Sequence, residues 1–268
     1  MVRFFSIIFL FCCMDVYSQV EFIFIKEIKT ESTNFTTDQL GNIFLLKDGG
    51  ITKINATNNK QKTYSNNLFG KISRIDASDP FRILVFSKDF NKILFLDNNL
   101  SEIASPIELY NLGYYNVSSV CQSNSGGFWL FDQNLNELVY FNRNLKQEKR
   151  SSQITSLLNP DIEINEVFME EKNDYIYLGI EGEGVLLFDI YGTYIKTFPL
   201  KEICRFQIID GNIIYLNKDV LNIYQTKNFN KDILDLPIEN SINARIIQKN
   251  ILVLTNDKLI EYQLNNIK

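Results

Sequence analysis

The chain has 268 residues, of which 45% are hydrophobic, 13% aromatic and 22% charged. This balance is typical of a globular protein and excludes a largely disordered one. A formal net charge of −5 and the lack of long Lys/Arg runs argue against nucleic acid as a partner. The densest basic stretch, Lys146–Arg150, contains an acid and adjoins a predicted turn, which indicates a solvated loop.

The N-terminal segment is typical of a secretory signal peptide. Arg3 precedes an apolar run, Phe4–Met14, that is too short to cross a bilayer as a helix. Val16 and Ser18 then place small residues at the −3 and −1 positions of a cleavage site before Gln19. We therefore expect residues 1–18 to be removed and residues 19–268 to form one exported domain, periplasmic or associated with the outer membrane.

Two further features of the chain bear on its membrane attachment. The tandem Cys12-Cys13 allows a lipoprotein hypothesis, but Phe9-Leu10-Phe11 lacks the small residues that a lipobox needs before its Cys. No later segment has the length and apolarity of a transmembrane helix. We therefore expect no transmembrane segment after signal cleavage.

A pattern of two short apolar strands separated by a polar turn recurs six times along the chain. Its copies are anchored at Ile43, Ile83, Phe128, Ile176, Ile213 and Ile251, at steps of 40, 45, 48, 37 and 38 residues. A repeat of this length built from short strands predicts the blades of a β-propeller. The predicted fold is therefore all-β: a six-bladed propeller of four-stranded antiparallel blades.

The first strand of the mature chain has no blade of its own. Glu21–Ile28 precedes the first copy, and the last copy ends near Leu264, before a full outer strand. We expect Glu21–Ile28 to supply that strand, because pairing the first segment with the last closes the ring and removes open sheet edges.

The second blade illustrates the expected plan. Its four strands are predicted, from the axis outward, over Ile72–Ile75, Phe81–Phe86, Lys92–Leu96 and Leu100–Ala104. Pro106, Pro199 and Pro237 follow their anchors at 23 or 24 residues, which places them at the outer edges, where a missing N–H is tolerated. Blade 3 departs from this spacing, and we assign an insertion, as a loop or short helix, to Ser151–Asn165.

The mature chain keeps two cysteines. Cys121 and Cys204 fall on the predicted first strands of blades 3 and 5, with a blade between them. Their Cα atoms should be too far apart for a disulfide. We expect two buried free thiols.

Two short stretches carry a resemblance to known propeller repeats. Thr37–Leu45 (TDQLGNIFL) resembles the D-x-x-G-N-I-Y segment of NHL-type repeats. Gly179–Asp189 (GIEGEGVLLFD) is similar to the G-T-x-x-G-G-L-x-x-F-D segment of propeller repeats in bacterial two-component sensors, and Gly127–Leu130 is a weaker match. The other copies lack these glycines, so the chain is a divergent relative. The resemblance implies a bacterial propeller used for binding or sensing, and it transfers no catalytic residue.

The chain contains no histidine. This excludes histidine general bases, Ser-His-Asp and Cys-His arrangements, and histidine-ligated metals. No Gly-Lys-Ser/Thr phosphate loop and no G-x-S-x-G elbow occurs. We therefore predict a protein that is not an enzyme.

Carboxylate and amide side chains gather in the predicted turns between second and third strands. They are Asp48, Asp89, Asp132 with Gln133, Glu181 with Glu183, Asp219 and Asp257. These turns share one face around the central channel, so their oxygens are candidate ligand contacts and could hold Ca²⁺. The simpler interpretation is that Asp, Asn and Gly are the ordinary residues of tight turns. Six-bladed sugar-lactone hydrolases hold a metal in a similar channel, which keeps a metal-dependent lactonase or sugar-dehydrogenase-like enzyme as the alternative.

Aromatic side chains suggest a different kind of contact. Tyr110, Tyr114 and Tyr115 lie in the loop that opens blade 3, where exposed tyrosines would suit a protein interface or sugar stacking. They could equally form the apolar lip of a strand. Trp129, the only Trp, is assigned to the core between blades.

The function predicted from the sequence is non-catalytic binding of a protein or glycan partner in the bacterial cell envelope. The rigid scaffold and variable loops of a propeller suit such a role. The candidate ligand-binding residues are Asp48, Asp89, Gln133, Glu181, Asp219, Asp257, Tyr114 and Tyr115. A structural subunit of a larger envelope complex is a third possibility.

Overall fold

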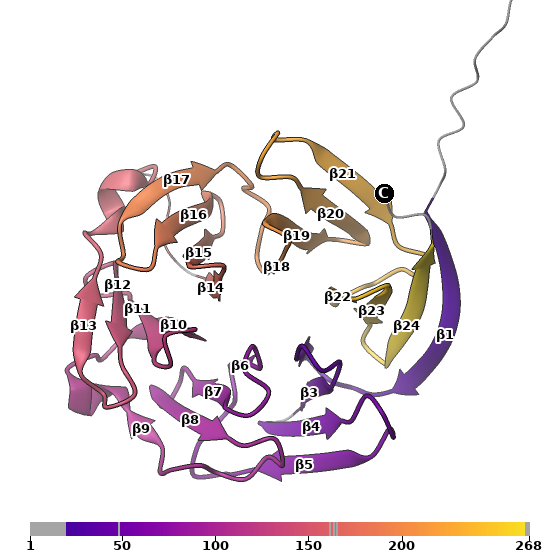
Figure 1. Ribbon diagram of the computed structural model, residues 1–268, viewed down its shortest axis with the longest axis horizontal. Coiled ribbons are helices and arrows are strands. Elements are labelled where there is room, and N and C mark those ends of the chain that lie inside the picture. Colours follow the sequence, from indigo (N-terminus) through magenta and orange to yellow (C-terminus); the bar gives the residue numbers. More distant parts are fainter. Residues whose placement is uncertain (1–19, 48, 161, 163, 165, 266–268) are drawn as a thin grey trace, which may run out of the picture.

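The computed structural model describes residues 20–47, 49–160, 162, 164 and 166–265 as a ring of six four-stranded antiparallel sheets (Figure 1). The order of the strands within each blade follows the chain, with the first strand nearest the axis and the fourth outermost. The last blade is the exception, because its outermost strand is the N-terminal strand of the chain. The predicted all-β, six-bladed propeller is confirmed. No helix in the described part of the chain has the length and apolarity needed to cross a membrane.

The first three blades are consecutive in the chain. Blade 1 contains β2 (Asn34–Thr37), β3 (Ile43–Lys47), β4 (Gly50–Ile54) and β5 (Gln61–Ser65). Blade 2 contains β6 (Arg74–Asp76), β7 (Ile83–Ser87), β8 (Lys92–Leu96) and β9 (Ile107–Glu108). A short 3₁₀ helix, η1 (Leu109–Leu112), leads into blade 3, which contains β10 (Val117–Gln122), β11 (Phe128–Asp132), β12 (Glu137–Phe141) and β13 (Gln147–Arg150).

The remaining blades complete the ring. A second 3₁₀ helix, η2 (Ile154–Leu157), precedes blade 4, which contains β14 (Val167–Lys172), β15 (Tyr175–Ile180), β16 (Gly184–Asp189) and β17 (Tyr194–Phe198). Blade 5 contains β18 (Gln207–Ile209), β19 (Asn212–Asn217), β20 (Val220–Tyr224) and β21 (Lys231–Asp235). Blade 6 contains β22 (Asn243–Ile247), β23 (Asn250–Leu254), β24 (Lys258–Asn265) and the N-terminal β1 (Glu21–Lys29).

The ring closes as the sequence predicts. Strand β1 pairs antiparallel with β24, with Phe22 opposite Leu264 and Ile28 opposite Leu259. The rings of Phe22 and Tyr262 lie 5.9 Å apart in an edge-on contact. The first and last strands of the chain thus share one sheet, so the ring closes within a blade and not between two blades.

The core lies between neighbouring blades. All five residues of β7 are buried, as expected for a sheet covered on both faces. Trp129 is fully buried and packs with Met169 and Ile176 of blade 4, which confirms its assignment to the core between blades. Each sheet is therefore held by its neighbours rather than by a separate core of its own.

A repeated turn ends the third strand of the first four blades. In each, an Asn or Asp side chain accepts backbone N–H groups two to four residues ahead, at Asn55, Asp97, Asn142 and Asp189. These are the residues that end the repeated sequence motif. Short polar side chains stabilise such turns because they replace a backbone acceptor locally.

The outer strand of blade 2 is not where the sequence predicts it. Residues Leu100–Ala104 contribute only an isolated bridge, Leu96 to Glu102, and the outer strand is Ile107–Glu108. The turn at Asp97 is of the same kind as those at Asn142 and Asp189, after which the outer strand follows within five residues, so the turn itself does not account for the difference. In blade 2 the chain after the turn meets β8 only through this bridge and the N–H of Ile103 on the carbonyl of Phe95, and regular pairing resumes at Ile107. Pro106 therefore precedes its outer strand, whereas Pro199 and Pro237 follow β17 and β21.

Three smaller predictions can be compared with the structure. The innermost strand of blade 2 begins at Arg74 and not at Ile72. The insertion at Ser151–Asn165 contains η2, as expected for a loop or short helix. Cys121 is buried, but Cys204 is exposed and lies before β18, so the prediction of a second buried thiol is wrong.

Candidate binding sites on the two faces of the ring

The turns of each antiparallel blade alternate between the two faces of the ring. Turns from first to second strand and from third to fourth strand lie on one face, which we call the cavity face. Turns from second to third strand, and the connections between blades, lie on the other, which we call the loop face. The two faces carry different side chains.

The predicted turn residues lie on the loop face, one blade apart from one another. Asp89, Gln133, Glu181, Asp219 and Asp257 belong to the second-to-third turns of blades 2 to 6. Asp48 lies outside the described residues. Within the part of the chain that the structure describes, no three Asp, Glu or Cys side chains are grouped so as to hold a metal ion.

Several of these side chains stabilise their own surroundings. Asp219 accepts the N–H of Ser241 at 2.7 Å, and this hydrogen bond holds the pKa of Asp219 below its usual value. Asp257 accepts the hydroxyl of Thr255 at 2.8 Å, and Gln133 donates to the carbonyl of Ile164. The described contacts are those of ordinary turn residues.

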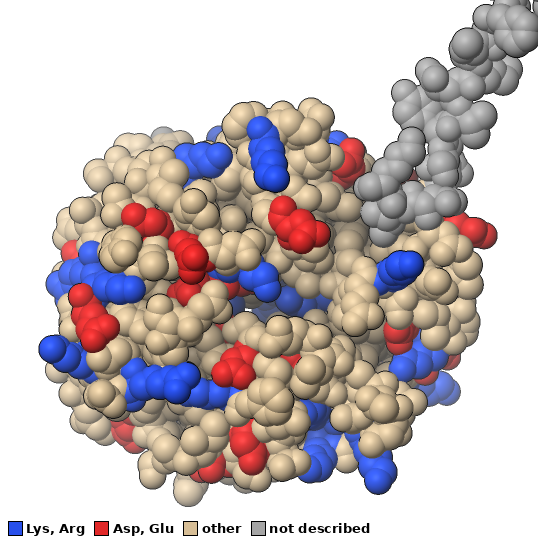
Figure 2. Space-filling model, in the orientation of Figure 1, with Lys and Arg blue, Asp and Glu red and all other residues tan. Residues whose placement is uncertain are grey.

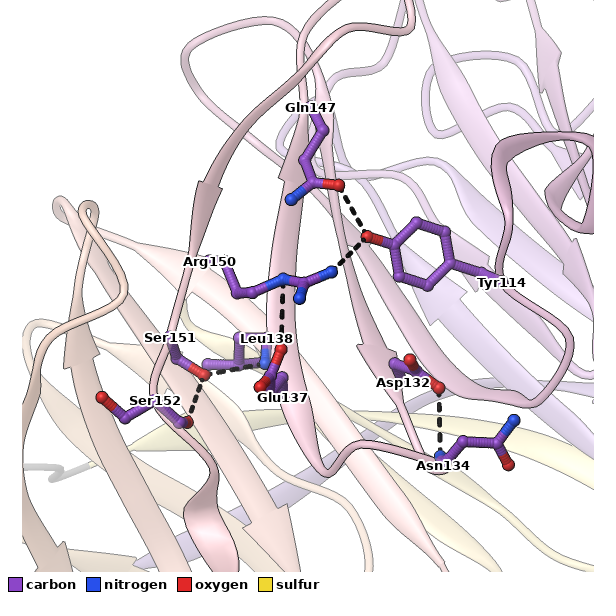
Figure 3. Close-up of polar contacts among 9 residues, drawn as sticks. All are labelled: Tyr114, Asp132, Asn134, Glu137, Leu138, Gln147, Arg150, Ser151 and Ser152. Atoms are coloured by element: carbon purple, nitrogen blue, oxygen red, sulfur yellow. Dashed lines mark hydrogen bonds and ion pairs between the residues drawn. The ribbon is translucent and has the colours of Figure 1, made fainter.

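Tyr114 is buried rather than exposed. Only 5% of its surface is accessible, and its hydroxyl donates to Gln147 Oε1 at 2.7 Å and accepts from Arg150 at 3.1 Å (Figure 3). Arg150 in turn pairs with Glu137 at 3.1 Å. Tyr114 therefore ties the loop that opens blade 3 to the outer strand β13, and an exposed role for it is wrong.

The loop face carries a cluster of exposed apolar side chains on blades 1 to 3, which we call the apolar patch. Its members and their exposed fractions are Leu68 (86%), Phe90 (51%), Tyr110 (47%), Tyr115 (72%) and Leu135 (41%). The two tyrosines are predicted from the sequence, and the other three are not. The sequence feature that could have identified them is an apolar residue within an otherwise polar turn, as in Lys88-Asp89-Phe90-Asn91.

The loops that carry the patch are joined side by side. The ring of Phe90 lies over Gly70, where an added Cβ would come within 2.1 Å of a ring carbon. Asn91 accepts the N–H of Leu109 at 3.0 Å and donates its side chain to the carbonyl of Tyr114 at 2.6 Å.

The same arrangement continues into blade 3. The carbonyl of Asn116 accepts the N–H of Gln133 at 2.9 Å. The five side chains therefore stand on contiguous, mutually fixed segments and not on independent loops.

The cavity face holds a cavity of about 360 Å³ near the axis, formed by blades 1 to 4. Apart from Gly126, every lining residue has a polar or charged side chain. The amides are Gln39, Gln122, Asn124 and Asn173, and the basic residues are Arg82, Arg143 and Lys172. Figure 2 shows basic and acidic side chains around a hollow at the centre of the ring. None of these residues is predicted from the sequence, because they come from inner strands and from turns of different blades and belong to no motif.

A buried carboxylate supports one wall of this cavity. Glu171, 5% exposed, accepts Trp129 Nε1 and the N–H of Asn124, both at 2.8 Å. It thereby connects β14 to the first turn of blade 3. The neighbouring Glu170 accepts the N–H of Ile208 at 3.4 Å and lies near the charges of Arg245 and Arg74, and burial raises the pKa of Glu170.

Comparisons with known proteins identify the fold and nothing finer. No protein-family model matches the chain, and no curated protein matches it. The fold is similar to that of virginiamycin B lyase from Staphylococcus aureus, with a TM-score of 0.64 and 13% identity over 91% of this chain and all of that one. A catalytically inactive His-to-Ala variant of that enzyme with quinupristin gives 0.59 and 14%, over 86% and 80% of the two chains.

A protein of another kind has a similar fold. BBS1N in complex with ARL6DN matches with a TM-score of 0.57 and 11% identity, over 88% of this chain and 78% of that one. Identities this low establish a shared propeller and do not transfer an activity.

Proposed function

We propose that the chain is an exported, non-catalytic binding module of the bacterial cell envelope that holds a protein partner on the apolar patch. The observation that carries the proposal is the grouping of Leu68, Phe90, Tyr110, Tyr115 and Leu135 on hydrogen-bonded loops. Contiguous exposed apolar surface of this kind marks interaction sites on soluble proteins. The rigid blades beneath reduce the entropy cost of binding because the loops are already fixed.

The composition of the patch favours a protein over a glycan. Leu68, Phe90 and Leu135 offer no side-chain hydrogen bond, whereas a sugar presents hydroxyl groups that need partners. Exposed polar residues such as Lys71, Lys88 and Asn111 surround the patch. An apolar centre with a polar rim and enriched tyrosine is the usual composition of protein interfaces.

The residues present support a role without catalysis. The variant of virginiamycin B lyase described above is inactive after loss of one histidine. This chain has no histidine, so it cannot supply such a group. The alternative, a metal-dependent lactonase-like or sugar-dehydrogenase-like enzyme, needs convergent carboxylates, and those of the described turns stand on separate blades.

The test is affinity isolation of the tagged protein from the membranes of its own cells. We expect one stoichiometric protein partner. The double variant Leu68→Ser/Tyr115→Ser should lose it by at least about tenfold, because central apolar anchors each contribute about 1–2 kcal/mol or more. The mass of the isolated protein should also show loss of residues 1–18.

The matched control is the double variant Phe81→Ser/Tyr191→Ser on the cavity face, whose side chains are 65% and 67% exposed. It should retain the partner. Retention by the patch variant, equal loss in the control, or isolation of a glycan in place of a protein would each contradict the proposal.

A further inference from the structure

The cavity on the opposite face has hydrogen-bond donors that the protein does not use. Among the described residues, no acceptor lies within hydrogen-bond distance of the Arg82 guanidinium, which instead stacks on the ring of Phe95 at 3.5 Å. Arg143 uses its Nε on the carbonyl of Gly126 at 3.0 Å and leaves its terminal nitrogens without a described partner. Both arginines line the cavity.

The three acids of the cavity, by contrast, already have partners. Glu171 accepts from Trp129 and Asn124, Asp79 accepts the N–H of Phe81 at 2.9 Å, and Glu170 accepts the N–H of Ile208 at 3.4 Å and lies near the charges of Arg245 and Arg74. Because a carboxylate only accepts and a guanidinium only donates, the unused capacity of the site is donor capacity. A ligand that fits must therefore bring acceptors.

Electrostatics favour acceptors that carry negative charge. Burial, and then the nearby charge of Arg143, lowers the pKa of Arg82, and the nearby charge of Asp79 acts in the opposite direction. An anion near both guanidinium groups would be attracted by both charges, and charge-assisted hydrogen bonds from guanidinium to carboxylate or phosphate are among the strongest in proteins. The buried Nε atoms of Arg74 and Arg245, whose charges act on the cavity residue Glu170, also have no described acceptor.

The side chains that line the cavity indicate the polarity of the rest of the ligand, and the volume indicates its size. Four amide side chains and two serine hydroxyls, with no aliphatic or aromatic side chain among the lining residues, suit a ligand rich in hydroxyl groups. A volume of about 360 Å³ lies at the small end of ligand pockets.

We propose that this cavity binds a monosaccharide-sized anionic sugar derivative, whose carboxylate or phosphate is held by Arg82 and Arg143. Its hydroxyl groups face the amide-lined walls. The site lies on the face opposite the apolar patch and is independent of the partner proposed for that patch.

Calorimetric titration of the full chain tests the proposal with glucuronate, glucose 6-phosphate, glucose and inorganic phosphate. We expect at least one of the two sugar anions to bind at least about tenfold more tightly than glucose and than inorganic phosphate. The comparison between them separates a carboxylate ligand from a phosphate one. Trp129, the only Trp, is hydrogen-bonded to the cavity residue Glu171, so its fluorescence should change on binding.

The variants Arg82→Ala and Arg143→Ala should each weaken binding by about tenfold to a hundredfold, the range expected for a lost charge-assisted contact. Lys88→Ala, in a turn of the loop face, should leave the affinity unchanged. Because Arg82 also packs on Phe95, the result for its variant counts only if the variant unfolds at the same temperature as the unmodified protein. If it does not, the proposal is tested by Arg143→Ala and by the salt dependence of binding. Raising NaCl from about 50 to about 500 mM should weaken binding by the unmodified protein.

Four results would overturn the proposal. They are no binding by either sugar anion up to roughly 10 mM, equal binding of glucose, equal binding of inorganic phosphate, and affinity that is indifferent to Arg143 and to salt.

Discussion

The two faces of the ring are made by the same blades and carry candidate sites of opposite chemistry. The loop face exposes Leu68, Phe90 and Tyr115 on segments fixed by backbone hydrogen bonds, with a buried tyrosine behind them. The cavity face encloses polar and charged side chains, supported by a buried carboxylate. Since an antiparallel blade sends alternate turns to opposite faces, one scaffold can carry two independent sites. The strands set the ring, and the turns set what each face can bind.

The largest effect should come from removing the carboxylate that supports the cavity face. Glu171→Ala leaves the buried indole N–H of Trp129, and the N–H of the exposed residue Asn124, without this acceptor. The buried group alone costs about 1–3 kcal/mol, which corresponds to a fall in Tm of roughly 3–10 °C for a domain of this size. Thermal unfolding followed by circular dichroism measures this change.

The same variant sharpens the comparison of the faces. Below its Tm, Glu171→Ala should bind the sugar anion more weakly while still retaining the protein partner, because the apolar patch lies across the ring. Glu181→Ala, whose side chain is exposed in a turn of the loop face, is the control and should leave Tm within about 1 °C. An unchanged Tm in Glu171→Ala would mean that the two hydrogen bonds do not hold blades 3 and 4 together.

A smaller effect is expected from the tyrosine that supports the loop face. Tyr114→Phe removes one hydroxyl that bonds both Gln147 and Arg150, while it keeps the buried ring. The loss should be about 1 kcal/mol, or a fall in Tm of roughly 2–4 °C. Tyr115→Phe, 72% exposed, is the matched control and should not change Tm. Equal shifts in the two variants would show that the network in Figure 3 does not stabilise the loop.

The sequence was sufficient for the ring and insufficient for its sites. Blade number and closure follow from a repeat whose apolar strands recur at regular spacing, and Glu21–Ile28 has no other place to pair. The outer strand of blade 2 lies at Ile107–Glu108 and not at Leu100–Ala104, although the turn at Asp97 is of the kind that precedes the outer strands of blades 3 and 4. The apolar pattern of Leu100–Ala104 did not distinguish an isolated bridge from a paired strand.

The sites depend on contacts between segments that are distant in the chain. Tyr114 and Tyr115 are adjacent, yet one is buried and the other exposed, because Gln147 and Arg150 of the outer strand capture only the first. Arg82 and Arg143 belong to turns of different blades and meet only in the ring. No local pattern contains that information.

The smallest expected effect is that of calcium, and it tests whether the loop face is a metal centre instead of a docking surface. A site with a Kd of about 50 μM would stabilise the protein by about 2.7 kcal/mol at 5 mM Ca²⁺, which would raise Tm by several degrees. We expect no shift, because Asp219 and Asp257 are engaged with Ser241 and Thr255 and stand on different blades.

Differential scanning calorimetry with Ca²⁺ or with EDTA gives the measurement, and Mg²⁺ at equal ionic strength is the control. If Ca²⁺ but not Mg²⁺ raised the Tm, and Asp257→Asn abolished the rise, these carboxylates would be metal ligands and not only turn residues. It would also restore the lactonase-like alternative, because Ca²⁺ needs several oxygen ligands at once and could be held only if turns from separate blades converged on it. The apolar patch would then border a metal site, and the contrast between an apolar loop face and a polar cavity face would no longer hold.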